Sequence, residues 1–380
     1  MDYQIGLRSF FLLLASLQAV IFSALLVYRA ARQYSLSDKL LAAFLVALAA
    51  TLGEHIAGWM GWYQGQALTF FPFGNNFLYA PLAYLYVKSV TNPGYRFRGT
   101  DWLLFIPACI YFIIHFGIWS MPIPEKLSTL KAMATISRPN YYFIEGAFDL
   151  LNLLVFTFLS IRHYLAYLRW LPSEFSNLPP VTLAWLRNFL VILFAVCFVE
   201  LAFTVTSLFI NYWYDVHYWD YFIRAVLLYY LSIAGYTYTQ PKALTLASES
   251  VTAPATTLPA LEATEGLLPV PQLISYMQSA RPYLDPELSL KQLAEQLNSP
   301  AALVSQTINA SLGKNFNDFV NEYRVLEICA RLQAGEHLSK TLLGVGLDSG
   351  FNSKATFNRS FKRITGLTPK EWVDQKLDSK

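Results

Sequence analysis

Seven long apolar runs fill most of the N-terminal part of the chain and limit the folds open to it. They occupy residues 9–28, 40–59, 70–90, 102–119, 141–161, 188–210 and 218–238. Each run can cross a hydrocarbon core of about 30 Å as an α-helix, which satisfies its own backbone hydrogen bonds in lipid. One such run could be the core helix of a soluble protein, but seven in succession predict a seven-helix transmembrane bundle. The third run contains Pro72 and Pro81 and is expected to be kinked or broken.

The distribution of charge divides the chain into parts of different character. The whole chain is 55% hydrophobic and 16% aromatic, which is high for a soluble protein. Residues 1–242 carry 15 Lys or Arg and 11 Asp or Glu, whereas the much shorter stretch 270–380 carries 13 and 11. Residues 239–269 are rich in Ala, Thr, Ser and Pro, which is typical of a flexible linker and less so of a packed segment. The sequence therefore predicts a transmembrane domain over 1–238, a flexible linker over 239–269 and a polar domain over 270–380.

The loops between the apolar runs indicate an orientation in the membrane, because cytoplasmic loops are enriched in Lys and Arg. Loops 60–69 and 211–217 contain neither residue, whereas the loop 120–140 is an exception with three basic residues. Basic residues follow the first and third runs and surround the loop between the fifth and sixth: Arg29, Arg32, Lys39, Lys88, Arg96, Arg98, Arg162, Arg169 and Arg187. We therefore expect the N-terminus outside the membrane and, after seven crossings, the C-terminus in the cytoplasm.

A helical period on a polar background begins at Val270 and predicts two similar pairs of short helices. In the first pair, "LSLKQLAEQLN" has Ser289 as its N-cap, and a second helix begins at Ser299, with Pro300 at its first helical position and Gly313 just past its end. A long helix over Phe316–Ala334 follows, and then the pattern repeats in "SKTLLGVGLDSG" and "NSKATFNRSFKRITG". Two short helices joined by a tight turn form a helix-turn-helix, so the pattern predicts two of them.

The last of these helices combines an apolar stripe with a basic face. Phe357, Phe361 and Ile364 lie on one side, and we expect them to pack inward below Phe351. A charged helix face is often simply solvated, but in a helix-turn-helix the exposed face of the second helix lies in the major groove of DNA. The residues expected to contact DNA from this second recognition helix are Asn352, Ser353, Lys354, Asn358, Arg359, Lys362 and Arg363. From the first recognition helix we expect Ser305, Gln306 and Asn309.

The duplicated pattern resembles the AraC/XylS family of bacterial transcription regulators. The resemblance rests on "GFNSKATFNRSFKRITGLTPKEW" and "SLKQLAEQLNSPAALVSQTIN" and covers about 105 of the 380 residues. It implies that double-stranded promoter DNA and RNA polymerase are partners, and that the membrane is the bacterial cytoplasmic (inner) membrane. The layout, including "PLAYLYVKS", is also similar to membrane-bound members of Bacteroidetes-type bacteria. Gly344 and Gly346 depart from the family, which has better helix formers there, so the second supporting helix is expected to be soft.

Ionisable residues within the apolar runs are candidates for a binding pocket, since charges in a membrane are expensive unless they have a role. The candidate pocket residues are Glu54, His55, His115, Glu145, Asp149, Glu200 and Arg224. With the orientation above they lie at outer or middle depth, as in a receptor open to the outside. An equally weighted alternative is a set of interhelical contacts, with an Asp220–Arg224 pair at i,i+4.

Motifs for catalysis or metal binding are lacking, so the sequence predicts no enzyme, no metal site and no cofactor. The function expected is a membrane-embedded one-component transcription regulator. Its partners would be promoter DNA, the lipid membrane, an unknown small-molecule or membrane signal, and a second copy of the chain in a homodimer. The alternative is a transporter-like or purely anchoring membrane domain fused to a DNA-binding module.

Overall fold

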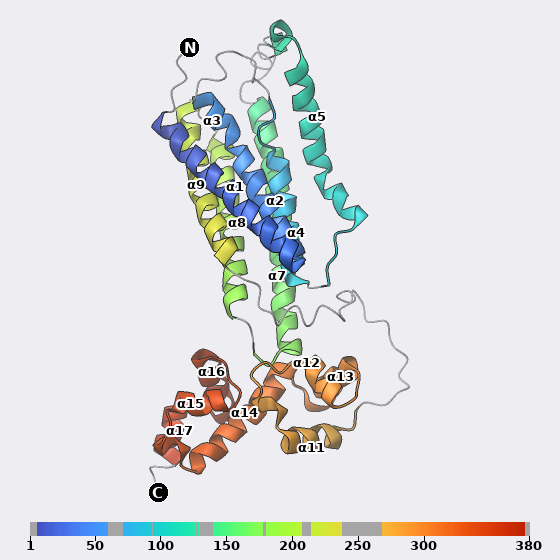
Figure 1. Cartoon of the computed structure of the whole chain (residues 1–380), viewed down its shortest axis with the longest axis vertical. Helices are drawn as coiled ribbons and strands as arrows, with labels where there is room; N and C mark the ends of the chain where they lie inside the picture. The colour runs from blue at the N-terminus through green and yellow to red at the C-terminus, as the bar shows by residue number, and fades with distance from the viewer. Residues whose placement is uncertain are drawn as a thin grey trace. The chain divides into compact units, whose positions relative to one another are not determined.

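The computed structural model describes residues 6–59, 71–92, 94–126, 128–129, 140–177, 180–206, 214–237 and 268–376. Every element of these residues is a helix, which confirms the all-α prediction (Figure 1). By their contacts the chain divides into two compact units. One comprises Met1–Leu165 and Pro180–Ala253, and the other Ala166–Pro179 and Pro254–Lys380. The predicted linker 239–269 lies outside the described residues, apart from its last two positions.

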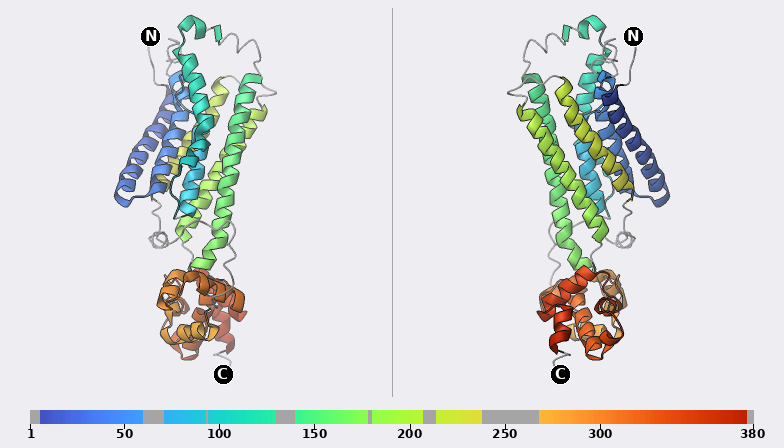
Figure 2. Two further views of the ribbon diagram at one scale, coloured as in Figure 1. Left: turned by 90° about the vertical axis from the view of Figure 1, so that its right-hand side faces the viewer. Right: turned by 90° about the vertical axis from the view of Figure 1, so that its left-hand side faces the viewer.

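The first unit is a bundle of long apolar helices that run alongside one another (Figure 2). Its elements are α1 (Leu7–Gln33), α2 (Leu36–Thr51), α3 (Gly53–Trp59), α4 (Asn76–Thr91), η2 (Gly99–Phe105), α5 (Ile106–Ser120), most of α7 (Asn140–Glu174), α8 (Pro180–Thr206) and α9 (Tyr214–Thr237). Helix α2 is the most enclosed, with Leu41, Phe44 and Leu45 in the core. At one end Arg29 of α1 pairs with Asp38 of α2 at 2.6 Å, and this contact ties the ends of two neighbouring helices together.

Five helices among the described residues are long and apolar enough to cross a membrane, judged by length and composition alone. They are Leu7–Gln33, Leu36–Gly58, Gly99–Ser120, Gly146–Glu174 and Ala184–Thr206. The predicted third and seventh spans coincide with α4 and α9, which do not reach that standard. Helix α4 has 16 residues with Pro81 inside it, and α9 carries Asp220 and Arg224. The count of seven spans therefore stays a prediction.

The second unit has two small hydrophobic cores that share one helix, α14 (Phe316–Gln333). The first core lies among α11 (Val270–Ala280), η4 (Pro282–Leu284), α12 (Leu290–Gln296), α13 (Ala301–Leu312) and the start of α14. The second lies among the rest of α14, α15 (Leu342–Asp348), α16 (Lys354–Thr365) and α17 (Pro369–Lys376), with η5 (Glu336–Leu338) between α14 and α15. Because α14 contributes Phe319 to one core and Ile328 to the other, it joins the two halves rigidly.

Most helix ends of this unit lie where the sequence predicts them. Ser289 caps α12 with a capping box that includes Gln292. Gly313 and Gly366 end α13 and α16 in the left-handed region, with φ of 64° and 80°. One expectation is wrong by a residue: α13 begins at Ala301, and Pro300 is its N-cap rather than its first helical residue. The extended backbone of Pro300, with ψ of 136°, explains the shift.

Candidate nucleic-acid interface

The second helix-turn-helix consists of α15 and α16, and aromatic packing fixes its geometry. The ring of Phe357 packs between Phe351 in the turn and Phe361 one turn later, with ring centroids 5.8 and 5.9 Å apart; the first pair is tilted and the second is edge-to-face. Ser353 caps α16 by accepting a hydrogen bond from the backbone N–H of Thr356 at 3.2 Å. The three phenylalanines are buried, so the opposite face of α16 must point outward.

The outward face of α16 carries the predicted contact residues. Lys354, Asn358, Arg359 and Lys362 are exposed, as is Asn352 in the turn before the helix. Ser353 is half-buried because its hydroxyl serves as the N-cap. The face therefore presents three basic side chains and amide groups that can donate to phosphates and to base edges.

A groove of about 620 Å³ lies beside this face, between α15, α16 and the start of α17. Its walls carry Lys354, Arg359, Lys362 and Lys370 above apolar side chains that include Phe357. At its edge α17 begins with a capping box in which Thr368 N–H donates to Glu371 at 2.8 Å, and this contact lowers the pKa of that carboxyl. The groove is basic on its rim and apolar below, a combination suited to a phosphate backbone that passes along the helix.

Arg363, also predicted to contact DNA, is engaged within the domain. Its guanidinium pairs with Asp318 in the first turn of α14 at 2.5 Å, and the two side chains are 50% and 32% exposed. The pair links the end of α16 to the start of α14. It also neutralises part of the positive charge that the sequence alone assigns to this end of α16.

The first helix-turn-helix, α12 and α13, presents a polar but uncharged face. Gln306 and Asn309 are exposed, whereas Ser305 is half-buried and accepts a hydrogen bond from Asn309 at 3.3 Å. Val304 and Ile308 are buried beneath them, in the core of this half. The exposed amides suit hydrogen bonding to base edges.

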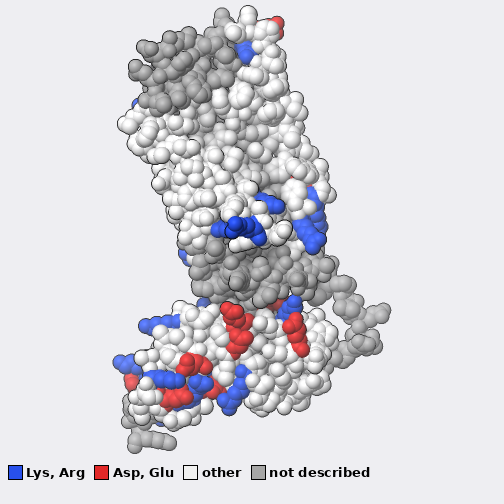
Figure 3. Space-filling model, viewed as in Figure 1, with Lys and Arg blue, Asp and Glu red and all other residues white. Residues whose placement is uncertain are grey.

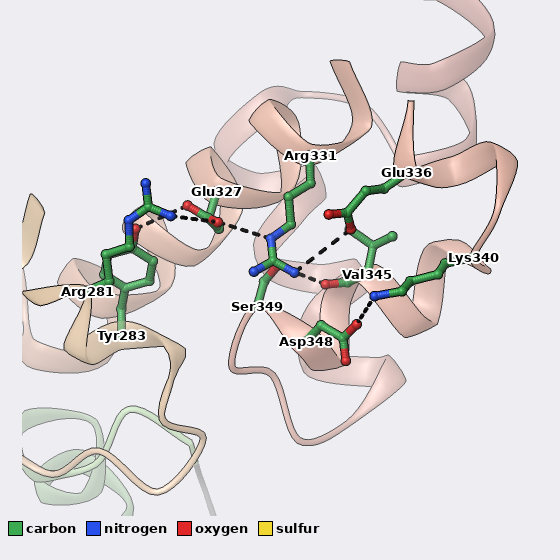
Figure 4. A network of polar contacts seen from close by, with 9 residues as sticks. All are labelled: Arg281, Tyr283, Glu327, Arg331, Glu336, Lys340, Val345, Asp348 and Ser349. Carbon is green, nitrogen blue, oxygen red and sulfur yellow. Dashed lines mark hydrogen bonds and ion pairs between the residues drawn. The ribbon is translucent and has the colours of Figure 1, made fainter. Parts of the chain in front are cut away.

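Polar contacts across α14 hold the two halves together (Figure 4). Glu327 accepts hydrogen bonds from the Tyr283 hydroxyl at 3.2 Å and from Arg331 at 3.0 Å, and it pairs with Arg281 at 3.4 Å. Lys340 pairs with Asp348 at 2.7 Å at the other end of the network. Charged side chains of both signs crowd this unit in Figure 3, while most of the visible face of the first unit is free of them.

Two glycines of the second helix-turn-helix allow close approaches. Gly350 adopts a φ of 94°, and a Cβ there would lie 2.3 Å from the carbonyl oxygen of Tyr283 and 2.8 Å from Nε of Arg324. A Cβ at Gly346 would lie 3.0 Å from the ring of Phe357. The departure at Gly346 from the better helix formers expected in α15 therefore has a packing reason, since the glycine lets the Phe357 ring lie against the helix.

Arg324 is a central residue that the sequence did not single out. It is fully buried on α14, and burial lowers the pKa of its guanidinium. Its Nε donates to the carbonyl of Tyr283 at 2.7 Å and its Nη2 to that of Asp285 at 2.7 Å. No spacing or composition signal marks it, because an arginine in a long polar helix is normally solvated.

The polar residues of the membrane half form a buried cluster among four helices. Arg224 of α9 pairs with Asp220 at 2.8 Å and also with Glu200 of α8. Asp149 of α7 accepts a hydrogen bond from the side chain of Asn76 in α4 at 2.8 Å, and the charge of Arg224 acts on it. The structure thus brings together three of the candidate pocket residues, with the Asp220–Arg224 pair that the alternative interpretation expects.

Of the remaining pocket candidates, His55 borders this cluster, because the Arg224 guanidinium lies over the Tyr221 ring on which His55 stacks, 5.3 Å from its centroid. His55 is buried and stacks on Tyr221 of α9, with ring centroids 3.5 Å apart. Nδ1 of His115 lies 3.1 Å from the backbone carbonyl oxygen of Tyr111, one turn earlier in α5, and no described contact joins His115 to the cluster. The side chains of Glu54 and Glu145 are not among those described. Among the described residues no group of three His, Cys, Asp or Glu could hold a metal ion.

Comparison with known proteins identifies the C-terminal part. Residues 293–375 match the family described as "Helix-turn-helix domain". Similar curated proteins include uncharacterised HTH-type transcriptional regulators of Staphylococcus aureus strains COL, MSSA476 and N315. Each is 34% identical over 86 residues, which is 23% of this chain and 11% of the relative.

The chain thus spans about a tenth of the length of these relatives, 11% by aligned residues. No solved structure matches it. The C-terminal part is therefore a helix-turn-helix domain homologous to those of HTH-type regulators.

Proposed function

We propose that the chain is a membrane-embedded, one-component transcription regulator of the AraC type that binds promoter DNA through both helix-turn-helix units. The main support for this proposal is the exposed basic face of α16, which points outward because the phenylalanines on its other side are buried. This helix lies in a domain that matches the helix-turn-helix family. The names of the Staphylococcus aureus relatives, HTH-type transcriptional regulators, support the same function. In this proposal the chain acts by binding DNA and recruiting or blocking RNA polymerase, and it is not an enzyme.

We assign the predicted contact residues to roles according to their positions on the exposed faces of α16 and α13. Lys354, Asn358 and Arg359 read base edges in the major groove, and Lys362 contacts phosphate. Arg363 contacts phosphate only when Asp318 releases it. On the first recognition helix, Gln306 and Asn309 read base edges, with Ser305 placing the Asn309 amide. Asn352 and Ser353 approach the backbone of DNA at the start of α16.

A selection experiment with the full chain tests this function. The protein in detergent micelles would be incubated with a random pool of DNA duplexes, and the enriched sequences would then be bound by variants. Arg359→Ala should lose about 1–3 kcal/mol of discrimination at particular base pairs, while Lys362→Ala should weaken binding to all duplexes and flatten the salt dependence.

The matched control is Lys376→Ala, which removes an exposed base at the far end of α17. Enrichment of no sequence, or an unchanged site preference in Arg359→Ala, would contradict the proposed role of α16.

The apolar helices support a membrane location with the N-terminus outside and the DNA-binding domain in the cytoplasm. Five described helices have the necessary length and composition, and the charged loops favour this direction. Reporter fusions test the orientation: a fusion after Lys242 should behave as cytoplasmic, and one in the loop 211–217 as external. The reverse result would be incompatible with DNA binding.

For the membrane half we propose signal detection by the cluster around Arg224, with a purely anchoring role as the second candidate. The ion pairs with Asp220 and Glu200 favour the anchor, because they already satisfy much of the buried charge. Charge-neutral Glu200→Gln and Arg224→Gln should fix reporter transcription high or low at normal abundance if the cluster detects a signal. Normal regulation in both variants, or a joint loss of abundance, would favour the anchor.

A further inference from the structure

Three residues that follow α7 are built into the second unit, although their partners there lie 109 to 173 positions later in the chain. Phe175 pairs with Ser289 in an antiparallel bridge. The backbone N–H of Ser176 donates to the carbonyl of Leu288 at 3.3 Å, and its hydroxyl donates to the same carbonyl at 2.6 Å. Ser176 is completely buried. These residues therefore belong to the interior of the domain and do not merely touch its surface.

The connecting helix α14 binds this segment from the other side. Arg324 donates from Nη2 to the Ser176 hydroxyl at 3.0 Å and from Nη1 to the Ser176 carbonyl at 3.3 Å. The side chain of Asn317 donates to the carbonyls of Phe175 at 3.2 Å and Ser176 at 2.7 Å. A buried guanidinium is costly unless its donors are satisfied. Ser176 supplies two of the acceptors that Arg324 uses.

Asn177 connects the two halves of the domain directly. Its amide nitrogen donates to the carbonyl of Pro286 at 2.6 Å, in the turn before α12. The same nitrogen donates to the carbonyl of Gly350 at 3.1 Å, in the turn before α16. A primary amide has two N–H donors, and both are used here, one for each helix-turn-helix. The side chain therefore fixes the distance between the turn before α12, the first helix of one helix-turn-helix, and the turn before α16, the second helix of the other.

The contacts of this segment leave the candidate DNA faces uncovered. They involve residues 286–289, α14 and Gly350, whereas Gln306, Asn309 and Arg359 remain exposed. Binding of the segment and binding of DNA are therefore compatible.

We infer that Phe175–Asn177 is a clasp that sets the placement of the two helix-turn-helix units relative to each other and attaches the end of α7 to both. Helix α7 is continuous from Asn140 to Glu174, and the clasp begins at the next residue. A displacement of the end of α7 therefore reaches the segment before α12 and the turn before α16, one in each helix-turn-helix, without passing through residues 239–269. Recognition helices that enter successive major grooves must lie about 34 Å apart along DNA, so their relative placement controls affinity. This last step rests on the proposed function, whereas the clasp itself does not.

Hydrogen exchange in the full chain tests the clasp. Asn177→Asp keeps the shape of the side chain but replaces two donors with acceptors that face the carbonyls of Pro286 and Gly350. Asn177→Ala removes the donors without adding repulsion. The matched control is Gln333→Glu, an amide-to-acid change at an exposed position at the end of α14.

In Asn177→Asp, amides within 284–288 and 349–351 should exchange at least about tenfold faster than in the wild type, equivalent to about 1.4 kcal/mol. Asn177→Ala should show a smaller increase in the same segments, and amides of α13 should change less than about twofold. Unchanged exchange in both variants would overturn the clasp. Equal acceleration throughout the unit, α13 included, would also overturn it, because Asn177 would then support the fold in general.

Affinity for a duplex selected with the wild-type chain separates the clasp from the proposed function. Asn177→Asp should bind that duplex at least tenfold more weakly, while Gln333→Glu binds normally. Faster exchange with unchanged affinity would overturn the coupling to DNA reading. The expected exchange pattern in a wild-type chain that selects no duplex would leave the clasp intact and contradict the proposed function.

Discussion

Replacing Gly350 by alanine should destabilise the helix-turn-helix unit by more than the usual cost of a side chain in left-handed backbone. The φ of 94° costs an L-residue about 1–2 kcal/mol. The new Cβ would also lie 2.3 Å from the carbonyl oxygen of Tyr283, far inside van der Waals contact. The Tyr283–Leu284 backbone must then retreat and weaken the 2.7 Å hydrogen bond from Arg324. Leaving that buried donor unsatisfied adds about 1–3 kcal/mol.

The sum for Gly350→Ala is therefore about 2–5 kcal/mol. Gly366→Ala is a matched control because Gly366 has a similar φ of 80°, yet a Cβ there would meet nothing within 4 Å. The control should lose only the backbone part, about 1–2 kcal/mol. The difference between the two variants isolates the close approach to Tyr283.

Native-state hydrogen exchange of the full chain in micelles measures these values as free energies of opening for α14 and α16 amides. Exchange avoids the need to unfold the membrane helices. Equal losses of opening free energy in Gly350→Ala and Gly366→Ala would refute the steric reasoning, because the contact of the new Cβ with Tyr283 would then add no cost.

Three further outcomes follow from the same unit. Gly346→Ala should destabilise α15 by about 1 kcal/mol, because crowding of the buried Phe357 ring outweighs the gain in helix propensity. Gly344→Ala in the same helix should be neutral or stabilise it by up to about 1 kcal/mol. Hydrogen exchange of the α15 amides measures both effects, and stabilisation by both variants would refute the packing role of Gly346. Asp318→Asn should free Arg363 and steepen the salt dependence of DNA binding, a log–log slope, by about 0.9; an unchanged slope in a potassium chloride titration would contradict this. Burial raises the pKa of Cys329 to about 11, above the ordinary value of 9.0, so its contribution to stability is complete below pH 9 and is lost as the pH rises toward 11. Iodoacetamide should therefore label this thiol slowly at pH 8 in the folded chain and quickly after denaturation, and rapid labelling of the folded chain would contradict the shift.

Local signals in the sequence were sufficient for the elements that carry the candidate DNA face. Ser289, Gly313 and Gly366 mark helix ends because capping depends on the residue type at one position. The outward placement of Arg359 follows from the spacing of Phe357 and its neighbours within one helix. Such contacts span only three or four residues, so a single sequence contains them.

Contacts between distant segments could not be read in the same way. Ser176 and Asn177 are small polar residues in an ordinary connection, and their partners lie 109 to 173 positions later. The burial of Arg324 depends on those partners, so it was equally hidden. His115 was grouped with the membrane cluster by depth along its helix, but depth does not specify which neighbouring helix a side chain faces. The packing of α5 is a tertiary property that composition does not encode.

The clasp has a consequence for the order in which the protein is made and for any event that cuts it. The ribosome synthesises Phe175–Asn177 before the domain into which they fit. These residues therefore have no partners to bind until α8, α9 and the helix-turn-helix domain have been made. A protease that cleaved between Thr237 and Leu268 would separate the helix-turn-helix domain covalently from this segment, which would stay with the membrane part. A released fragment would diffuse freely but would lack the acceptors that Ser176 supplies to Arg324. Such a fragment would not be equivalent to the tethered domain, and the intact chain is therefore the form in which both recognition helices are fully supported.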